Sequence, residues 1–90
     1  MWKTEFKKTF LKELSKIPKE IRAEIEKIVF EELHCENPFN LGYLEKLIGY
    51  KNKYKIRKGN YRVGLTIDNQ KKTIILNRVA HRKDIYKIFP

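Results

Sequence analysis

The chain has little cysteine and no long apolar segment. Cys35 is its only cysteine, so no disulfide can form within the chain, and a reducing compartment suits such a sequence. Unbroken runs of aliphatic or aromatic residues reach only three residues, as at positions 28–30, whereas a membrane-spanning helix needs about 20. The first residues also lack an apolar core of signal-peptide length. We therefore expect a cytoplasmic protein without membrane contact.

Glycine and histidine are also scarce. None of the four glycines lies at the spacing of a phosphate-binding loop. The two histidines, His34 and His81, are far apart in the sequence, and the neighbours of His34, Cys35 and Glu36, do not complete a set of metal ligands. We therefore expect neither a metal ion nor another cofactor.

Acidic residues are absent between Lys46 and Ile67. Residues 46–90 contain thirteen lysines and arginines but only two acids, a net charge of +11, whereas residues 1–45 have a net charge of −1. Like charges crowded into half of a small domain repel one another and lower its stability. A purely solvated basic surface is the alternative. The polarised charge favours binding of a polyanion, and nucleic acid is the commonest polyanion in a cell.

The first half of the chain has the periodicity of helices, within a length of 90 residues that suits a single domain, residues 1–90. Apolar residues recur at helical spacing in two stripes separated by Pro18. We expect a helical hairpin, preceded by a short strand at residues 1–3 and ended near Pro38. The first stripe is Phe6, Phe10, Leu11, Leu14 and Ile17, and the second is Ile21, Ile25, Ile28, Val29 and Leu33.

From Tyr54 the apolar period changes to two, which is typical of strands. Residues 54–57 and 61–68 alternate around a short turn, and residues 73–79 form a last, apolar strand. Residues 41–53 fit either a short helix or an irregular strand. The order predicts an α+β fold, in which an N-terminal strand and a helical hairpin pack on one face of a small, mainly antiparallel sheet.

The other face of this sheet is expected to be basic and open. If Tyr61 is buried in the core, its neighbour Arg62 points to the opposite face. Lys55 and Arg57 share that opposite face when Ile56 is buried. These cations would then lie within a side chain's reach of one another.

Basic and aromatic side chains also follow the last strand, at His81, Arg82, Lys83 and Tyr86. Arg82 and Tyr86 are four residues apart, so on a turn or short helix they converge. RNA cleavage without a metal needs a base to take the proton of a 2′-hydroxyl, cations to stabilise the phosphorane, and an acid to protonate the leaving 5′-oxygen. These residue types suit that chemistry, and they also suit a basic module that binds RNA without cutting it.

Three segments together resemble the RelE/ParE toxin superfamily. They are Tyr54-Lys55-Ile56-Arg57, Gly59-Asn60-Tyr61-Arg62 and Val79-Ala80-His81-Arg82-Lys83-Asp84-Ile85-Tyr86. The helical hairpin, the Leu44-Glu45-Lys46-Leu47-Ile48-Gly49 segment and the chain length are similar too, so the resemblance covers essentially the whole chain. The ending Tyr-Lys-Ile-Phe-Pro is similar to that of archaeal and related RelE toxins.

The resemblance implies a RelE-like fold and a toxin of a type II toxin–antitoxin module. Such a toxin would be a ribosome-dependent endoribonuclease that cuts mRNA in the A site by metal-free attack of the 2′-hydroxyl. Its partners would be an acidic RelB-like antitoxin, the ribosome and mRNA, with DNA reached only through the antitoxin complex. The alternatives are a ParE-like inhibitor of DNA gyrase and a non-catalytic basic module that binds RNA or the ribosome.

The resemblance also implies roles for individual residues. Arg62 and Arg82 match the arginines that stabilise the phosphate, and Tyr86 matches the tyrosine that engages the 2′-hydroxyl. Lys55 and Arg57 match two basic strand residues, which are both lysines in the best-known member. Because an arginine keeps its proton, proton transfer is left to Lys55, His81 and Tyr86. Contacts with RNA are expected from Lys51, Lys53, Arg57, Lys58, Arg78 and Lys83.

Overall fold

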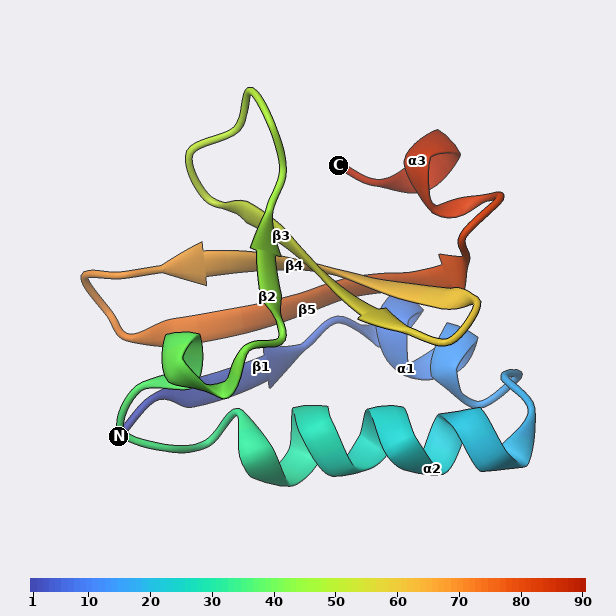
Figure 1. Ribbon diagram of the computed structural model, residues 1–90, viewed down its shortest axis with the longest axis horizontal. Coiled ribbons are helices and arrows are strands. Elements are labelled where there is room, and N and C mark those ends of the chain that lie inside the picture. The colour runs from blue at the N-terminus through green and yellow to red at the C-terminus, as the bar shows by residue number, and fades with distance from the viewer.

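A five-stranded sheet runs through the centre of the protein in a computed structural model that describes residues 1–90. The strand order is β1-β5-β4-β3-β2. β1 is parallel to β5, and every other neighbouring pair is antiparallel (Figure 1). This confirms the predicted α+β fold with a mainly antiparallel sheet. The strands are β1 (Lys3–Phe6), β2 (Leu44–Lys46), β3 (Lys53–Lys58), β4 (Tyr61–Asp68) and β5 (Thr73–His81).

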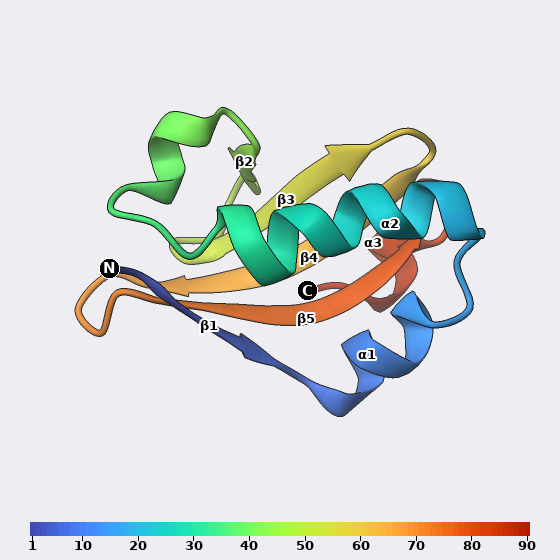
Figure 2. The same cartoon turned by 90° about the horizontal axis from the view of Figure 1, so that it is seen from below.

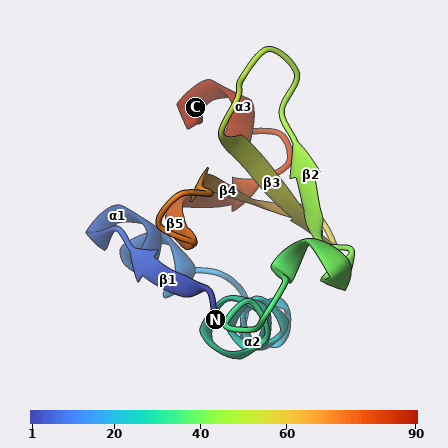
Figure 3. The same cartoon turned by 90° about the vertical axis from the view of Figure 1, so that its left-hand side faces the viewer.

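The helices lie on both faces of the sheet. α1 (Lys8–Leu14) and α2 (Lys19–Lys27) cover one face, and the short α3 (Ile85–Ile88) lies on the other (Figures 2 and 3). Pro18 precedes α2 and separates it from α1, as the sequence predicted. α2 continues into a π-helical turn, η1 (Ile28–Glu32), and a 3-10 turn, η2 (Pro38–Leu41), leads to β2. No helix is long and apolar enough to span a membrane.

The main core lies between the sheet and the helices α1 and α2. Four of the five residues of the second predicted stripe, Ile25, Ile28, Val29 and Leu33, are buried, and Ile21 is half-buried against the same core. The period of two in the strands is confirmed as well, since the residues that face these helices are buried. They are Ile56 from β3, Val63, Leu65 and Ile67 from β4, and Ile74, Leu76 and Val79 from β5.

The start of the chain differs from the expectation. The first strand is β1 at Lys3–Phe6 rather than residues 1–3, and the helix begins at Lys8. Phe6 therefore belongs to the strand, where it pairs with Leu76 of β5. Leu11, also assigned to the buried stripe, is 42% exposed. A spacing of four residues between Phe6 and Phe10 suggested one helix, but pairing with β5 places Phe6 in the sheet.

The second face of the sheet is not open as predicted. Leu47, Ile85 and Phe89 are buried there in a small separate cluster, which seats the C-terminal segment on the sheet. Gly64 of β4 lies under Phe89, and a Cβ atom at this position would be only 2.5 Å from Phe89 Cδ2. Because Gly64 has no side chain, the Phe89 ring can approach the strand closely, and burial of Ile85 and Phe89 removes apolar surface from water. The strand pairing is irregular at the same place, between Gly64 and Leu65.

Candidate functional site

The centre of the candidate site is a contact between Lys55 and Tyr86. Lys55 lies in β3 and Tyr86 in α3, on the face of the sheet away from α1 and α2. Lys55 Nζ donates a hydrogen bond of 2.8 Å to the Tyr86 hydroxyl and lies 5.4 Å from the centre of its ring. Tyr86 is 58% exposed, so its hydroxyl is open to a ligand. An amine and a phenol in this contact can exchange a proton and can both bind a phosphate oxygen.

Two arginines share this face with Lys55. Arg57 and Arg62 lie directly opposite each other in the β3–β4 ladder, and alternation along β3 puts Arg57 on the same side as Lys55. Arg62 Nη1 donates to the backbone oxygens of Gly59 and Tyr61, both at 2.9 Å, which holds the guanidinium beside the β3–β4 turn. The structure thus brings together three of the residues that the sequence placed on one basic face.

One acid, which the sequence interpretation left out, lies on this basic face. Glu45 of β2 pairs with Lys55 in the ladder, and its Oε1 accepts a hydrogen bond of 2.9 Å from Arg57 Nη2. Both side chains are exposed, so water screens the ion pair and its contribution to stability is small. The pair nevertheless occupies Arg57, and a ligand phosphate must compete with Glu45 for it.

His81 is not against the Lys55–Tyr86 contact. It pairs with Tyr61 in the β4–β5 ladder, with the two ring centres 5.6 Å apart and nearly perpendicular. Directly opposed residues share a face, so His81 is on the side of Tyr61 and not of Lys55. His81 Nδ1 accepts a hydrogen bond from the backbone N–H of Lys83. His81 therefore lies on the face opposite to the Lys55–Tyr86 contact.

Arg82 directly follows His81, the last residue of β5. Its backbone N–H donates to the oxygen of Asn60 at 2.7 Å, which ties this segment to the β3–β4 turn. The side chain is exposed and available for a ligand. The convergence of Arg82 and Tyr86 stays a prediction, and the hydroxyl of Tyr86 accepts a hydrogen bond from Lys55 of β3.

The lysines expected to contact RNA are distributed over both faces. Lys53 donates to Thr66 Oγ1 at 2.9 Å and lies 6.0 Å from the centre of the Phe89 ring, on the face of the site. Lys58 instead points to the helices, where its Nζ is 3.3 Å from Glu24 Oε1 of α2. Lys51 and Lys83 are exposed in segments outside the strands. The Lys58 prediction does not fit this geometry, because alternation puts it on the side of Tyr61.

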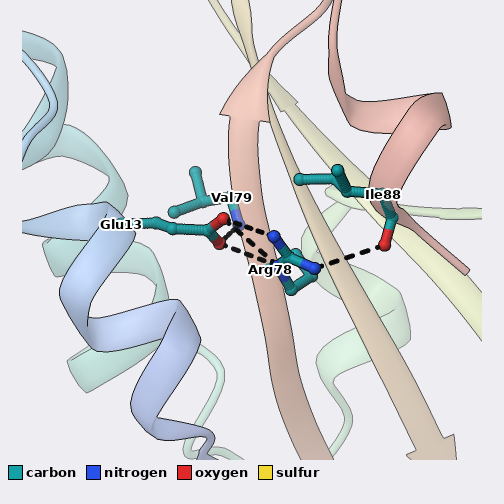
Figure 4. A network of polar contacts seen from close by, with 4 residues as sticks. All are labelled: Glu13, Arg78, Val79 and Ile88. Atoms are coloured by element: carbon teal, nitrogen blue, oxygen red, sulfur yellow. Dashed lines mark hydrogen bonds and ion pairs between the residues drawn. The ribbon is translucent and has the colours of Figure 1, made fainter.

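Arg78 is engaged within the protein (Figure 4). Its Nε and Nη2 donate to the carboxylate of Glu13 in α1, the shortest contact being 2.8 Å, and its Nη1 lies 3.5 Å from the oxygen of Ile88 in α3. Glu13 also accepts from the N–H of Val79. The hydrogen bond with Glu13 raises the pKa of Arg78 above its usual value, although partial burial opposes it. The prediction that Arg78 contacts RNA does not fit, because it links α1, β5 and α3 instead.

A groove of about 430 Å³ adjoins the Lys55–Tyr86 contact. The β2–β3 loop and the C-terminal segment form its walls, including Tyr50 and Phe89. The sequence assigned no role in a site to Tyr50 or Phe89. A signal existed at Gly64, because an isolated glycine inside a strand is typical of a bulge or a close backbone approach. No three His, Cys, Asp or Glu side chains come together as metal ligands.

Comparisons with known proteins identify the family of this chain. Residues 4–86 match the family model described as ParE toxin of type II toxin–antitoxin system, parDE. Toxin RelE3 of Methanocaldococcus jannaschii is 46% identical to this chain, over 98% of the chain and 99% of that protein. Toxin RelG of Mycobacterium tuberculosis is 33% identical, over 91% of the chain and 92% of that protein.

Solved structures show the same similarity to RelE toxins. A chain in the crystal structure of the RelB-RelE antitoxin–toxin complex from Methanococcus jannaschii has a TM-score of 0.78 and 41% identity, over 96% of this chain and 99% of that chain. The protein therefore belongs to the RelE/ParE family and is a RelE-like toxin of a type II toxin–antitoxin system. The resemblance noted in the sequence is thus confirmed at the level of the family and the fold.

Proposed function

We propose that this toxin is a ribosome-dependent endoribonuclease that cuts mRNA in the A site without a metal ion. The observation that carries the proposal is the hydrogen bond between Lys55 and Tyr86, on the face of the sheet that also holds Arg57 and Arg62. The reaction is attack of an RNA 2′-hydroxyl on the adjacent phosphorus. The P–O5′ bond breaks, leaving a 2′,3′-cyclic phosphate and a 5′-hydroxyl.

The side chains supply the steps of this reaction in the following way. Lys55 and Tyr86 are joined by a hydrogen bond, so one of them can take the 2′-hydroxyl proton while the other stabilises the resulting charge. Arg62 and Arg82 bind the phosphate, whose charge increases as the phosphorane forms. Arg57 adds a permanent positive charge but exchanges no proton. The leaving 5′-oxygen receives a proton from the acid of the pair or from water.

The proposed partner is an acidic, RelB-like antitoxin. The solved structure from M. jannaschii contains a RelB-RelE antitoxin–toxin complex, and the toxin chain there has the fold described here. The net charge of +11 on residues 46–90 would attract an acidic chain and would be neutralised by it. We expect the antitoxin to cover the helices and to displace or shield Tyr86. Both proteins would act in the cytoplasm, where ribosomes and mRNA are found.

The second candidate is a ParE-like inhibitor of DNA gyrase, which the description of the matching family favours. Such an inhibitor acts by binding, so it needs no proton-transfer pair. The exposed Lys55–Tyr86 contact supports the nuclease instead, because it places a base and an acid next to the arginines of one face. A basic module that only binds RNA would neither cut mRNA nor inhibit gyrase, so the cleavage and supercoiling assays distinguish it from both candidates.

The test is cleavage of ribosome-bound mRNA by purified toxin, with the cut mapped by primer extension. Tyr86→Phe keeps the ring near Lys55 but removes the hydroxyl, so we expect the cleavage rate to fall by about 10²- to 10⁴-fold. Arg62→Ala should lower it by about 10²- to 10³-fold, the usual loss for a preorganised donor. Tyr43→Phe is the matched control, because its hydroxyl is bonded to Glu32 away from the site.

One result would contradict the nuclease, and another would contradict only the catalytic role of the Lys55–Tyr86 contact. Wild-type toxin that leaves ribosome-bound mRNA intact but blocks DNA supercoiling by purified gyrase would establish the second candidate. Tyr86→Phe with the wild-type cleavage rate would show that the Lys55–Tyr86 contact has no part in catalysis.

A further inference from the structure

The groove beside the Lys55–Tyr86 contact has two walls. One is the end of β2 with the β2–β3 loop, and the other is formed by Tyr86, Phe89 and Pro90 of the C-terminal segment. Figures 1 and 3 show the loop rising from the sheet on the same side as α3. The volume of about 430 Å³ lies within the range of small-ligand sites, about 300–1,000 Å³. It is large enough for a flat aromatic group.

The β2–β3 loop exposes apolar side chains that the fold does not bury. Ile48 is 98% exposed and Tyr50 is 48% exposed, whereas the adjacent Leu47 is buried against Ile85 and Phe89. The N–H of Tyr50 donates to the oxygen of Leu47, so a turn closes the tip of the loop. The buried Leu47 and this turn hold Ile48 and Tyr50 outward. Large exposed apolar side chains beside a groove are typical of a binding surface.

Positive charge surrounds these apolar groups. Lys46 and Lys55 line the groove, and Lys51 lines an adjoining hollow that shares Lys46, Ile48 and Tyr50. The acid of the groove, Glu45, is already bound by Arg57. Aromatic rings flanked by cations are how proteins bind single-stranded nucleic acids, because bases stack on the rings while phosphates meet the cations.

The position of the groove selects RNA as the occupant. Lys55 and Tyr86 are at once members of the groove lining and the pair proposed for proton transfer. Each phosphate of an RNA chain joins two nucleotides, so a phosphate held at that pair has a base on either side of it. The groove is the apolar recess that Lys55 and Tyr86 border, and one of these bases can therefore enter it. An acidic peptide could also pair with the lysines of the groove, but the proposed proton transfer by Lys55 and Tyr86 acts on RNA and involves no peptide.

We propose that this groove is a base-binding subsite, in which a nucleobase next to the cleaved phosphate stacks on Tyr50 and contacts Ile48. The inference deepens the proposed nuclease function and rests on it. It assigns the β2–β3 loop to substrate binding, so that the loop contributes affinity and alignment while Lys55 and Tyr86 contribute chemistry.

The experiment measures binding of RNA trinucleotides to the free toxin by calorimetry. Each sugar carries a 2′-O-methyl group so that the RNA is not cut, and a second series lacks the base at one position at a time. Tyr50→Ala should weaken binding of the intact trinucleotide about five- to 150-fold, the range for loss of one base stack. Tyr50→Phe keeps the ring and should bind within about twofold of wild type. Phe30→Ala, which removes an aromatic ring of similar exposure from η1, is the matched control and should bind as wild type does.

The series without a base decides whether stacking is the cause. At one position, removal of the base should weaken binding to wild type and leave Tyr50→Ala unaffected. Equal loss for every trinucleotide, or no loss in Tyr50→Ala, would overturn the subsite. So would a Tyr50→Ala variant that loses affinity only for an acidic antitoxin peptide, since the loop would then be a protein-binding surface.

Failure of the subsite and failure of the nuclease give different results. If wild type and Tyr50→Ala cut ribosome-bound mRNA with the same KM and kcat, only the subsite is wrong. If wild-type toxin does not cut at all, the nuclease proposal is wrong, whatever the trinucleotides show, and the subsite loses its assignment to a cleaved phosphate.

Discussion

Gly64→Ala adds one methyl group at the point where the C-terminal segment meets the sheet. The new Cβ would lie 2.5, 2.6 and 2.8 Å from Cδ2, Cγ and Cε2 of Phe89, closer than carbon atoms approach in real proteins. Phe89 is buried with Leu47 and Ile85, so its ring cannot move without disturbing that cluster. Tyr86 follows Ile85 directly, and any shift of the segment moves its hydroxyl away from Lys55.

The size of the effect follows from two limits. If the ring adjusts in place, overpacking costs about 1–3 kcal/mol. If the ring is expelled, the loss approaches the 3–5 kcal/mol of a Phe→Ala substitution in a core. Replacing glycine in a strand returns about 0.5–1 kcal/mol, because the unfolded chain becomes less flexible. The net loss is then about 0–2.5 kcal/mol if the ring adjusts and about 2–4.5 kcal/mol if it is expelled. We therefore expect Gly64→Ala to lower the free energy of unfolding by about 2 kcal/mol, where the two ranges meet, and to lower mRNA cleavage as well.

Urea denaturation and the cleavage assay measure the two effects, and a double-mutant cycle identifies their cause. In a Phe89→Ala background the clash is gone, so Gly64→Ala should have little effect on stability there. The reasoning is refuted if Gly64→Ala keeps both wild-type stability and the wild-type cleavage rate. It is also refuted if the loss of stability is the same with and without Phe89.

Two further predictions concern polar contacts. The pKa of Tyr43 is raised above its usual 10.0, chiefly by the hydrogen bond to Glu32 and further by burial and by the charge of Glu32. Tyr43→Phe should lower the free energy of unfolding by about 1 kcal/mol at neutral pH. Urea denaturation should show this difference from wild type shrinking as the pH rises above 10.0 and through the raised folded-state pKa, because such a group contributes its full stability below the unfolded pKa and loses it as the folded group is deprotonated. Glu45→Gln should free Arg57, increase RNA affinity a few-fold, and steepen the slope of log affinity against log salt by up to about 0.7, the value for one added phosphate contact; an unchanged slope would show that Arg57 does not meet the RNA.

The sequence predicted those features that depend on local periodicity. The buried stripe from Ile25 to Leu33 and the alternation along β3 and β4 follow from spacing alone. The basic face was predictable for the same reason, because alternation relates Lys55 and Arg57 without any knowledge of the tertiary fold. Periodicity misled at Phe6, where pairing with a strand 70 residues later decided the outcome.

Contacts between distant segments could not be predicted in this way. Arg78 was treated as one more cation of the basic second half of the chain, and only the fold places Glu13, 65 residues earlier, against it. His81 was assigned to proton transfer from its place in the sequence, but its pairing with Tyr61 turns it to the other face. The resemblance to a known family supplied the residue types of the site, and the structure supplied the contact between Lys55 and Tyr86.

The position of Tyr86 depends on a weakly held part of the fold. α3 has only four residues, and a cluster of three buried side chains seats it on the sheet, whereas the main core contains fifteen buried residues. Segments with few buried contacts open at a lower free-energy cost than the whole domain. An antitoxin segment that competes for the groove at Phe89 would therefore separate Tyr86 from Lys55 without unfolding the toxin. Inhibition of this kind requires no contact with the arginines, and it is reversed when the C-terminal segment returns to Gly64.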